Sequence, residues 1–379
     1  MKTRIFYLTD LLSPYRVDWM NAMSDDFDIE CYVFDLDEKT RTKDWLTYRK
    51  PNFSVNTVSS TYFAGIRFSK ECTKILKNRN YDIYLIDGYA SYAQVSAIKK
   101  LTKLRKNVFV NIDGVDIWKN GGFLSRIKNV VKKEIFRSGA NFLCGSLVAK
   151  EYVLSLGAKK ENVFLHHFTS LFKKDLVDFS YKKNAQNGCK KMINCHGKKM
   201  ALAVGRFITI KRYDDLINAW TEMPKDWELY LIGGGRLYDW YSSLIREKGL
   251  TNVFLIDYIE PKELDKYYLA ADLFVHTSET ETWGLVLNEA MAKCCPCIAT
   301  DRCVAGIELI KNGINGFIYN VGDVKTLSKR IQEVLRDEYL TDKMMENAAE
   351  TIKCYTIENM AKTHIDIFRE VLSHAMGQC

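Results

Sequence analysis

Short apolar runs alternate along the first half of the chain with segments long enough to form helices. The runs read RIFYLTD, IECYVFD, YDIYLID, NVFVNID, ANFLCGS and VFLHHF. This alternation is typical of a parallel sheet with helices on both faces. The pattern therefore predicts a doubly wound α/β domain.

The alternation stops once and then resumes. Residues 172–199 are polar and rich in lysine, and we interpret them as the connection between two domains. Beyond them the runs MALAVGRF, WELYLIGG, VFLIDY, LFVHTS, CIAT and GFIYN again alternate with helical segments. The sequence predicts two Rossmann-like domains, over residues 1–185 and 186–379.

The end of the chain has a different pattern. Residues 341–376 have a helical pattern throughout. We expect the C-terminal helices to pack back across both domains, with a final helix over residues 356–376 returning to the N-terminal domain. Ligands of open α/β sheets bind beyond the carboxyl ends of the strands. Two such domains facing each other would enclose a central cleft.

Composition agrees with two globular domains. The chain has 379 residues, too many for one ordinary core, and 47% of them are hydrophobic. No apolar run reaches the roughly 18 residues of a transmembrane helix, and the N-terminus meets charge and proline too early for a signal peptide. We therefore expect a cytoplasmic protein, with contact to a membrane surface left open.

Cysteine usage points to reduced thiols. The chain has 11 cysteines and no recognisable export signal, which argues against a disulfide framework. Cys294 and Cys297 form a C-x-x-C, but no second C-x-x-C or C-x-x-H pair accompanies it. We expect no metal site here, and interpret the two cysteines as the end of a helix and the start of the strand CIAT.

Charge is distributed unevenly. Residues 1–200 carry 35 Lys+Arg against 20 Asp+Glu, whereas residues 201–379 carry 20 against 27. The first half is therefore expected to face something anionic, either nucleic acid or a phospholipid surface. The nucleic-acid interpretation is the weaker one, because no helix-turn-helix, zinc-finger or aromatic RNA motif accompanies the charge.

Two basic segments carry much of this charge. Either could be an ordinary surface helix or a helix that contacts a membrane. In the second of them, the basic residues surround an apolar face formed by Ile127, Val130, Val131 and Ile135. The basic residues are Lys99, Lys100, Lys103, Arg105 and Lys106 in the first segment, and Arg126, Lys128, Lys132, Lys133 and Arg137 in the second.

The stretch TSETETWGLVLNEAMA contains two glutamates, Glu281 and Glu289, on either side of a strand-to-helix junction near Gly284. Free N–H groups of residues 284–287 at the start of the helix would attract an anion. The carboxylates would instead accept hydrogen bonds from hydroxyls. A sugar attached to a nucleoside diphosphate has both features. The alternative is that Glu281 stabilises the helix start and Glu289 is solvated.

Two cations lie upstream in AVGRFITIKRYDDLINAW. Arg206 ends a strand and Lys211 begins a helix, so both are expected near the open end of the sheet. A guanidinium and an ammonium there suit a diphosphate without a metal, although an exposed surface pair is the alternative. Gly233 to Gly235 do not complete a dinucleotide fingerprint, because Tyr238 occupies the position of the third glycine.

Candidate residues in the first half also follow predicted strands. Asp113 and Asp116 in NIDGVDIW, and Tyr15 and Arg16 in SPYRVDWM, are placed near the open end of the sheet. Helix capping is the alternative for the aspartates. His166, followed by a second histidine, ends the last strand, where we expect at least one of the two to be structural.

Taken together, these motifs resemble the retaining family-4 glycosyltransferases of the GT-B fold. The resemblance covers about residues 200–335 and rests on VGRFITIKRYDDLINAW, LYLIGGG, YYLAADLFVHTSETETWGLVLNEAMA, CIATD and IKNGINGFIYNVGD, in the family's order. The first half is looser. Its segments SPYRVDWMNAM, NIDGVDIW and HHFTSL look like a bacterial surface-polysaccharide branch.

The resemblance implies a role for each candidate. Glu281 would contact hydroxyls of the donor sugar, and Glu289 would hold the ribose diol. Arg206 and Lys211 would bind the diphosphate. The family transfers with retention, and the leaving diphosphate helps to deprotonate the acceptor, so neither a protein nucleophile nor a metal or other cofactor is implied. Backbone N–H groups of Gly284, Leu285 and Val286 would complete the donor site.

Several positions depart from the family pattern. Asp113 stands where many relatives have a first-domain histidine near the reacting carbon, and LLSPYR replaces a glycine-rich loop. Cys294 occupies a position where relatives often have a helix-ending glycine, and Ala305 replaces one of a glycine pair. These departures weaken inferences about the acceptor more than about the donor.

The sequence thus predicts a hexosyltransferase that uses a nucleotide sugar, a UDP-sugar being favoured. Its acceptor would be a sugar hydroxyl of a lipid-linked glycan in bacterial surface polysaccharide biosynthesis, reached at the inner face of the membrane. Tyr15 and Arg16 are expected to contact substrate. The alternatives are a nucleotide-sugar epimerase or hydrolase of the same fold, and a non-catalytic module that binds sugar nucleotides or membranes.

Overall fold

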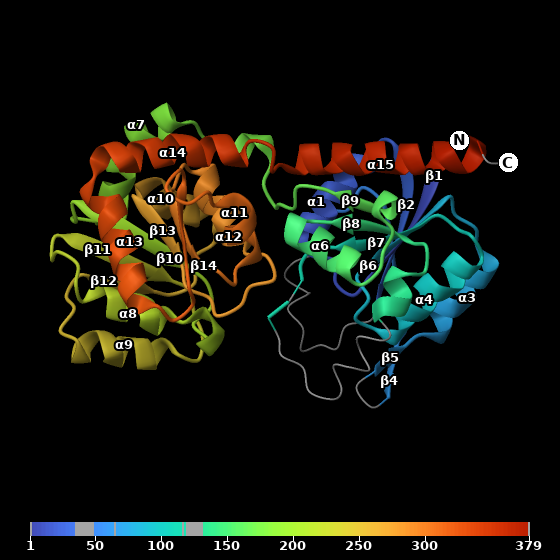
Figure 1. Ribbon diagram of the computed structural model, residues 1–379, viewed down its shortest axis with the longest axis horizontal. Helices are drawn as coiled ribbons and strands as arrows, with labels where there is room; N and C mark the ends of the chain where they lie inside the picture. The colour runs from blue at the N-terminus through green and yellow to red at the C-terminus, as the bar shows by residue number, and fades with distance from the viewer. Residues whose placement is uncertain (1, 35–48, 64–65, 116, 119–131, 378–379) are drawn as a thin grey trace. The chain divides into compact units, whose positions relative to one another are not determined.

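The computed structural model describes residues 2–34, 49–63, 66–115, 117–118 and 132–377 (Figure 1). The chain divides into two compact units. The first unit consists of residues 1–170 and 356–379, and the second unit of residues 171–355. Each has its own sheet and its own core.

Within its described residues, the first unit contains a parallel sheet of seven strands in the order β3-β2-β1-β6-β7-β8-β9. The order reverses between β1 and β6, which makes that junction the topological switch point. A short antiparallel hairpin, β4 and β5, stands apart from this sheet. The strands are β1 (Thr3–Thr9), β2 (Phe27–Phe34), β3 (Ser54–Val58), β4 (Thr61–Phe63), β5 (Ile66–Phe68), β6 (Ile83–Asp87), β7 (Val108–Ile112), β8 (Asn141–Cys144) and β9 (Val163–Leu165).

Alternate residues of β1 face opposite sides of this sheet. Phe6 and Leu8 join a core cluster with the buried residues of α3, α4 and α6. Tyr7 packs against Trp19 of α1, with ring centroids 6.3 Å apart. Both faces are therefore covered, as an all-parallel sheet requires. The helices are α1 (Pro14–Met23), α3 (Lys70–Asn78), α4 (Tyr92–Lys103), α6 (Leu147–Ser155), the 3₁₀ turn η1 (Lys160–Asn162) and α15 (Ile357–Gly377).

The described part of the second unit contains a parallel sheet of six strands in the order β12-β11-β10-β13-β14-β15, with its switch point between β10 and β13. This is the strand order of a dinucleotide-binding fold. The strands are β10 (Lys199–Val204), β11 (Trp227–Ile232), β12 (Val253–Ile256), β13 (Leu273–His276), β14 (Cys297–Thr300) and β15 (Gly316–Tyr319).

Helices cover the second sheet as well. Ala201 and Ala203 of β10 face a core built with Leu216, Trp220 and Tyr241. The helices are η2 (Lys173–Asp175), α7 (Phe179–Met192), η3 (Thr209–Lys211), α8 (Tyr213–Trp220), α9 (Tyr238–Glu247), α10 (Pro261–Ala270), α11 (Leu285–Ala292), α12 (Val304–Leu309), α13 (Val324–Arg336) and α14 (Glu338–Ile352). The prediction of two Rossmann-like doubly wound folds is confirmed.

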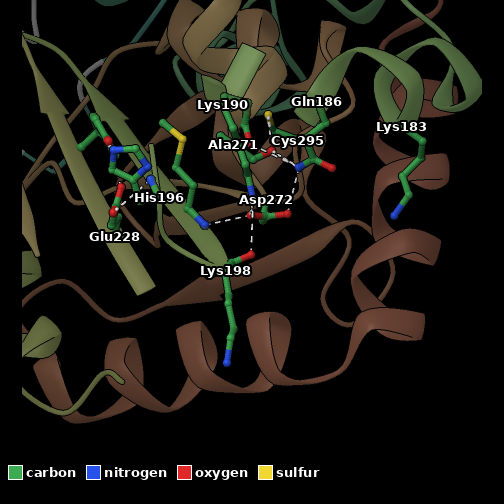
Figure 2. Close-up of polar contacts among 12 residues, drawn as sticks. Lys183, Gln186, Lys190, His196, Lys198, Glu228, Ala271, Asp272 and Cys295 are labelled. Atoms are coloured by element: carbon green, nitrogen blue, oxygen red, sulfur yellow. Dashed lines mark hydrogen bonds and ion pairs between the residues drawn. The ribbon is translucent and has the colours of Figure 1, made fainter. Parts of the chain in front are cut away.

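The lysine-rich segment after residue 172 is not an irregular connection. Its centre forms α7, which packs on α10. Lys182 is fully buried and its ammonium donates to the carbonyl oxygens of Tyr268 and Ala271, each at 2.7 Å. Gln186 and Lys190 both bind Asp272, each at 2.8 Å (Figure 2). The predicted boundary at residue 185 falls inside this helix, which belongs to the second unit.

The C-terminal helical segment consists of two helices, the second of which begins at Ile357, close to the start expected for a final helix over residues 356–376. A break at residues 353–356 separates α14, in the second unit, from α15, in the first. In α15, Phe368 packs on Phe109 of β7, with ring centroids 4.7 Å apart. His364 lies 4.6 Å from the Trp19 ring of α1. No helix among the described residues has both the length and the apolar character needed to cross a membrane.

Candidate functional site

Two loops meet at the switch point of the second sheet. One follows β10 and contains η3, and the other follows β13 and leads to α11. The Thr277 hydroxyl donates to the carbonyl oxygen of Lys211 at 2.6 Å, and the Glu279 N–H donates to that of Ile210 at 2.8 Å. These bonds fix the position of Lys211 relative to the β13 loop.

Lys211 and Glu281 form an ion pair in this loop junction. Their side chains are 14% and 24% exposed, so the pair is largely removed from water. A neighbouring loop holds the Glu281 backbone, because its N–H donates to the carbonyl oxygen of Arg302 at 2.9 Å. Burial alone would raise the pKa of Glu281, but His276 and Lys211 outweigh it and lower the pKa to about 2. Glu281 is therefore ionised at neutral pH.

His276 was not identified as a site residue by the sequence. It ends β13 and is 2% exposed, with Nε2 lying 3.7 Å from Glu281 Oε2. Burial lowers the pKa of His276. The ring thus presents a neutral imidazole to Glu281. Its position at the end of a strand beside the switch point was the signal that could have identified it.

Gly284 is the N-cap of α11, and the helix begins at Leu285 as predicted. Its φ of 114° lies in the left-handed region, and a Cβ there would lie 3.1 Å from Cys303 Sγ. The Leu287 N–H already donates to the carbonyl oxygen of Gly284 at 2.9 Å. The first N–H groups of an α-helix have no intrahelical partner. Those of Leu285 and Val286 therefore form the electropositive end of α11.

Glu289 lies in the second turn of α11. The Tyr268 hydroxyl of α10 donates to its Oε2 at 2.8 Å. Burial raises the pKa of Glu289 to about 7, although the Tyr268 hydrogen bond opposes the shift. The carboxyl group is thus poised between its neutral and charged forms at neutral pH. Glu281 and Glu289 flank the start of α11 as the sequence predicted, but their protonation differs.

Arg206 differs from Lys211 in its surroundings. It follows β10 and is exposed, and among the described residues its guanidinium makes no ion pair. Gly233, in the loop after β11, packs so closely on Gly205 that a Cβ on Gly233 would lie 2.0 Å from the Gly205 carbonyl oxygen. The glycine triplet therefore permits a close approach of two strand ends beside Arg206.

The first unit assembles its own polar cluster at the carboxyl ends of β1, β6 and β7. It brings together Tyr15, Arg16 and Asp113, as the sequence predicted for residues near the open end of that sheet. The Tyr15 hydroxyl and Arg16 Nη2 both donate to Asp113 Oδ2 at 3.1 Å. Arg16 Nε also lies 2.8 Å from Asp87 Oδ2. Asp116 lies outside the described residues.

Asp87 and Asn111 complete this cluster and were not identified from the sequence. The Thr9 hydroxyl donates to Asp87 Oδ2 at 2.7 Å, and Asn111 Nδ2 donates to Asp87 Oδ1 at 3.3 Å and to Asp113 Oδ1 at 2.7 Å. Burial raises the pKa of Asp87, while Arg16 opposes the shift. Asp87 ends an apolar strand at the switch point, a position that could have drawn attention to it.

His166 belongs to the packing of the first unit. It is 2% exposed, and its ring lies 4.6 Å from that of His364 in α15. Burial lowers the pKa of His166, and lowers that of His364 to about 4. Both rings are therefore neutral at neutral pH. The expectation that at least one of the two adjacent histidines is structural agrees with this environment.

Among the described residues, no group of three or more His, Cys, Asp or Glu is placed to hold a metal ion. The C-x-x-C cysteines are buried, with the Cys294 thiol 3.4 Å from the Val177 carbonyl oxygen and the Cys297 thiol 3.4 Å from that of Cys295. Cys294 has a φ of 57°, the left-handed conformation that a helix-ending glycine would adopt without strain.

Of the two basic segments of the first unit, the first is described in full and the second only in part. Arg126 and Lys128 lie outside the described residues. The Lys132 ammonium donates to the Tyr152 hydroxyl at 2.8 Å and lies over the rings of Tyr89 and Tyr152. Its packing therefore gives it a structural role. Lys133, next to it, is exposed.

Comparison with known proteins extends what the geometry indicates. Residues 190–351 match the family described as glycosyl transferases group 1. This segment contains Arg206, Lys211, Glu281 and Glu289, so all the predicted donor residues of the second unit fall within the match.

Curated relatives match about half of the chain. The N-acetyl-alpha-D-glucosaminyl L-malate synthase of Bacillus anthracis is 30% identical over 180 residues, covering 46% of this chain and 46% of the relative. The N-acetylgalactosamine-N,N'-diacetylbacillosaminyl-diphospho-undecaprenol 4-alpha-N-acetylgalactosaminyltransferase of Campylobacter jejuni is 27% identical, covering 47% of each chain. The chain thus spans about half the length of these relatives.

Solved structures match over nearly the whole chain. The Anabaena protein Alr3699/HepE in complex with UDP has a TM-score of 0.76 at 16% identity, covering 98% of this chain and 100% of that one. At this identity the likeness establishes the fold of the chain. It extends the match to the first unit, which the family match does not reach.

Proposed function

We propose, on the premise that this chain belongs to the glycosyl transferases group 1 family with the GT-B fold, that it is a retaining glycosyltransferase. It transfers a hexosyl group from a nucleotide sugar to a hydroxyl of a lipid-linked glycan. The observation that supports this most directly is the arrangement at the start of α11. An ionised Glu281, a lysine and an electropositive helix end lie together there.

Each charge at this site has a matching group on a nucleotide sugar. The diphosphate would take Lys211 as a counter-ion, together with the exposed Arg206 and the N–H groups of Leu285 and Val286. Glu281 would then accept hydrogen bonds from sugar hydroxyls, and Glu289 from the ribose diol. Binding of the donor thus exchanges the Lys211–Glu281 ion pair for contacts with the ligand.

The chemistry assigned to these residues is positioning and charge stabilisation. As the bond to the diphosphate lengthens, negative charge grows on the leaving group, where Arg206 and Lys211 stabilise it. The leaving oxygen accepts the proton of the acceptor hydroxyl, which attacks the sugar from the same face. The configuration at the sugar is therefore retained. Asp113 of the first unit is proposed to contact the reacting hydroxyl.

Names of related proteins favour a uridine nucleotide and a lipid-linked acceptor. Alr3699/HepE has structures with UDP and with UDP-glucose. The Campylobacter jejuni relative is named for a diphospho-undecaprenol substrate, and a Rhizobium meliloti relative for lipopolysaccharide core biosynthesis. We therefore propose a UDP-sugar donor and a role in surface polysaccharide biosynthesis.

A donor screen tests the first half of this proposal. The purified protein is incubated with UDP-, GDP-, ADP- and dTDP-sugars in the presence of EDTA, and its melting temperature and nucleotide release are measured. Binding to the folded state raises the melting temperature by mass action. A shift with UDP-sugars that survives EDTA supports a metal-independent site, and the absence of any shift contradicts the proposal.

Substitution at the two glutamates tests the residue roles. We expect Glu281→Ala to abolish transfer, because it removes the ionised acceptor and leaves Lys211 without its partner. Glu289→Ala is expected to weaken donor binding by about ten- to a hundredfold, equivalent to one or two charged hydrogen bonds. Sugar transfer and donor affinity are measured separately. Full transfer by the Glu281 variant would contradict the assignment.

The same assays separate the alternatives. An epimerase or hydrolase would consume the nucleotide sugar at the same rate with or without acceptor. A binding module would show the thermal shift and no turnover. A glycosyltransferase is expected to release nucleotide faster once an acceptor sugar is present.

A further inference from the structure

His276 is the last residue of β13, and its backbone pairs with Ala299 of β14 inside the sheet. Its side chain is 2% exposed, and its Nε2 lies 3.7 Å from Glu281 Oε2. This separation is too long for a hydrogen bond. Among the residues that the structure describes, Nε2 of His276 has no hydrogen-bond partner. A buried polar atom without a partner destabilises a folded protein, so this one requires an explanation.

The position of the ring proton follows from the charge of the neighbouring group. Burial lowers the pKa of His276, so the ring is neutral near pH 7 and has one N–H. Against the effect of burial, His276 and Lys211 lower the pKa of Glu281 to about 2, so its carboxylate only accepts hydrogen bonds. A proton on the other ring nitrogen would leave the lone pair of Nε2 facing this carboxylate. The Nε2–H form is therefore favoured, and His276 is a donor that Glu281 does not yet use.

Lys211 occupies Glu281 in the free protein. Its ammonium pairs with Oε2, the same carboxylate oxygen that faces His276. In the function proposed above, the diphosphate of the donor takes Lys211 as a counter-ion, and this oxygen loses its cation. Tyr213 and Cys303 also interact electrostatically with Glu281, but burial raises the pKa of both, so they are neutral near pH 7. Glu281 would then be an ionised group in a largely buried position, and such a group needs a hydrogen-bond donor.

Backbone hydrogen bonds keep the two side chains close to each other. The Glu281 N–H donates to the carbonyl oxygen of Arg302 at 2.9 Å, and the Glu281 carbonyl oxygen accepts from the Val304 N–H at 3.1 Å. The strand pairing of β13 with β14 holds His276 in the same way. A side-chain rotation of Glu281 that shortens the gap by about 0.8 Å would complete a hydrogen bond of the usual length, about 2.9 Å. The exchange therefore requires no movement of the backbone.

We propose that His276 is a positioning residue for the donor: when Lys211 moves to the diphosphate, the Nε2–H of His276 replaces it on Glu281 and holds the carboxylate for the hydroxyls of the donor sugar. The free protein thus keeps one donor in reserve, and binding of the nucleotide sugar exchanges the ion pair for this hydrogen bond. The inference rests on the proposed function. It adds to that site a residue that acts through Glu281 and does not itself touch the substrate.

Substitution of His276 in the full chain tests this role by comparing stability with UDP affinity. His276→Leu removes a buried atom that has no partner in the free protein, so the melting temperature should not fall. With UDP bound, the same variant leaves Glu281 without Lys211 and without His276. Its affinity for UDP should therefore fall by about ten- to a hundredfold, as for the loss of a hydrogen bond to a charged group. His276→Gln restores a neutral N–H of similar reach, and its UDP affinity should be within about threefold of the wild type.

A second measurement needs no nucleotide. Lys211→Met removes the cation from Glu281 in the free protein, so His276 should become the partner of Glu281 there. In that background His276→Leu should raise the equilibrium constant of unfolding by about tenfold or more, whereas alone it should change this constant by less than about threefold. Urea denaturation of the wild type, the two single variants and the double variant measures this coupling. The control is His364→Leu, at a buried histidine of the first unit, which should leave UDP affinity unchanged and show no coupling to Lys211→Met.

A purely structural role would give the reverse pattern. A His276→Leu variant that is clearly less stable than the wild type, or that binds UDP equally well, would overturn the inference. An equal effect of His276→Leu with and without Lys211 would overturn it as well. No binding of UDP by the folded wild-type protein would contradict the donor assignment, and with it the exchange. Coupling in the urea experiment would still support His276 as the second partner of Glu281, so the two failures can be told apart.

Discussion

The two glutamates around α11 have opposite protonation preferences, although both are shielded from water. Glu281 has a cation and an imidazole beside it, which lower its pKa to about 2 against the effect of burial. Glu289 accepts a hydrogen bond from the Tyr268 hydroxyl, and burial raises its pKa to about 7. Near neutral pH, a change of pH therefore alters the protonation of Glu289 but not that of Glu281.

UDP affinity should consequently depend on the protonation of Glu289. Below a pH of about 7 the carboxyl group gains a proton, and it then offers the ribose diol one acceptor fewer. We expect the dissociation constant for UDP to rise as pH falls, by up to about tenfold for each pH unit below the pKa. Calorimetric titration between about pH 5.5 and 8.5 measures this dependence.

The matched control is Glu289→Gln, which cannot titrate. Its UDP affinity should follow only the protonation of the nucleotide, so the difference between the two proteins isolates Glu289. The stability of the protein should show the opposite trend. A carboxyl group whose pKa is raised on folding favours the folded state below its unfolded pKa of about 4.5 and loses that contribution as pH rises through about 7. Identical UDP titrations for both proteins would contradict the prediction.

Helix α7 is the element whose lysines were given the wrong role from sequence. The eight Lys residues within positions 172–199 suggested a polar connection between domains, yet Lys182 is buried and its ammonium binds two carbonyl oxygens at the end of α10. Those carbonyl groups end a helix and have no intrahelical partners. The lysine thus provides hydrogen bonds that the α10 terminus lacks.

Lys182→Met should destabilise the second unit. The substitution keeps most of the side-chain volume but removes the ammonium donor from two buried carbonyl groups and leaves them the weaker Cys295 thiol and Gln186 amide, so the free energy of unfolding should fall by about 1–3 kcal/mol. Lys183→Met is the control, because that lysine pairs with Asp342 at a partly exposed site, where an ion pair contributes about 0–1 kcal/mol. Urea denaturation measures both. Equal losses would show that the buried hydrogen bonds are not the cause.

The elements that the sequence predicted well are those whose pattern is local. Runs such as Leu273-Phe274-Val275 form buried strands because every residue is apolar, and Gly284 marked the turn because its left-handed conformation leads into α11. Exposed strands were missed. In β3 four of five residues are exposed, so no apolar run marks this edge strand.

Site residues divide in the same way. Residues that follow strand ends, such as Glu281 and Asp113, could be found because parallel strands bring their carboxyl ends to one edge of the sheet. Their partners could not. Tyr268 is 21 residues from Glu289, and Arg16 is 97 residues from Asp113. Pairing over such separations depends on packing, which sequence periodicity does not contain.

Charge is distributed unevenly along the whole chain. The difference in charge between the two units, however, is smaller than the difference between the two halves of the sequence. The first unit, residues 1–170 and 356–379, carries 29 Lys+Arg against 21 Asp+Glu. The second unit, residues 171–355, carries 26 against 26 and is neutral. The lysines around α7 had made the first half look more basic. The remaining excess of positive charge still belongs to the unit proposed to bind the acceptor.

If this excess attracts an anionic membrane, exposed lysines of the first unit should carry the effect. Lys132 is unsuitable for a test because it packs on two tyrosine rings, so we choose Lys103 and Lys133, both exposed. Reversing both to glutamate should make the free energy of binding to phosphatidylglycerol vesicles, measured by sedimentation, about 2–4 kcal/mol less favourable. Each lysine contributes about 1 kcal/mol when it is neutralised and somewhat more when its charge is reversed. The effect should shrink with added salt.

The control is the reversal of Lys225 and Lys262, which are exposed in the second unit and change the net charge equally. If both pairs weaken vesicle binding to the same extent, net charge rather than the first unit governs the attraction, and the membrane-facing role of that unit is wrong.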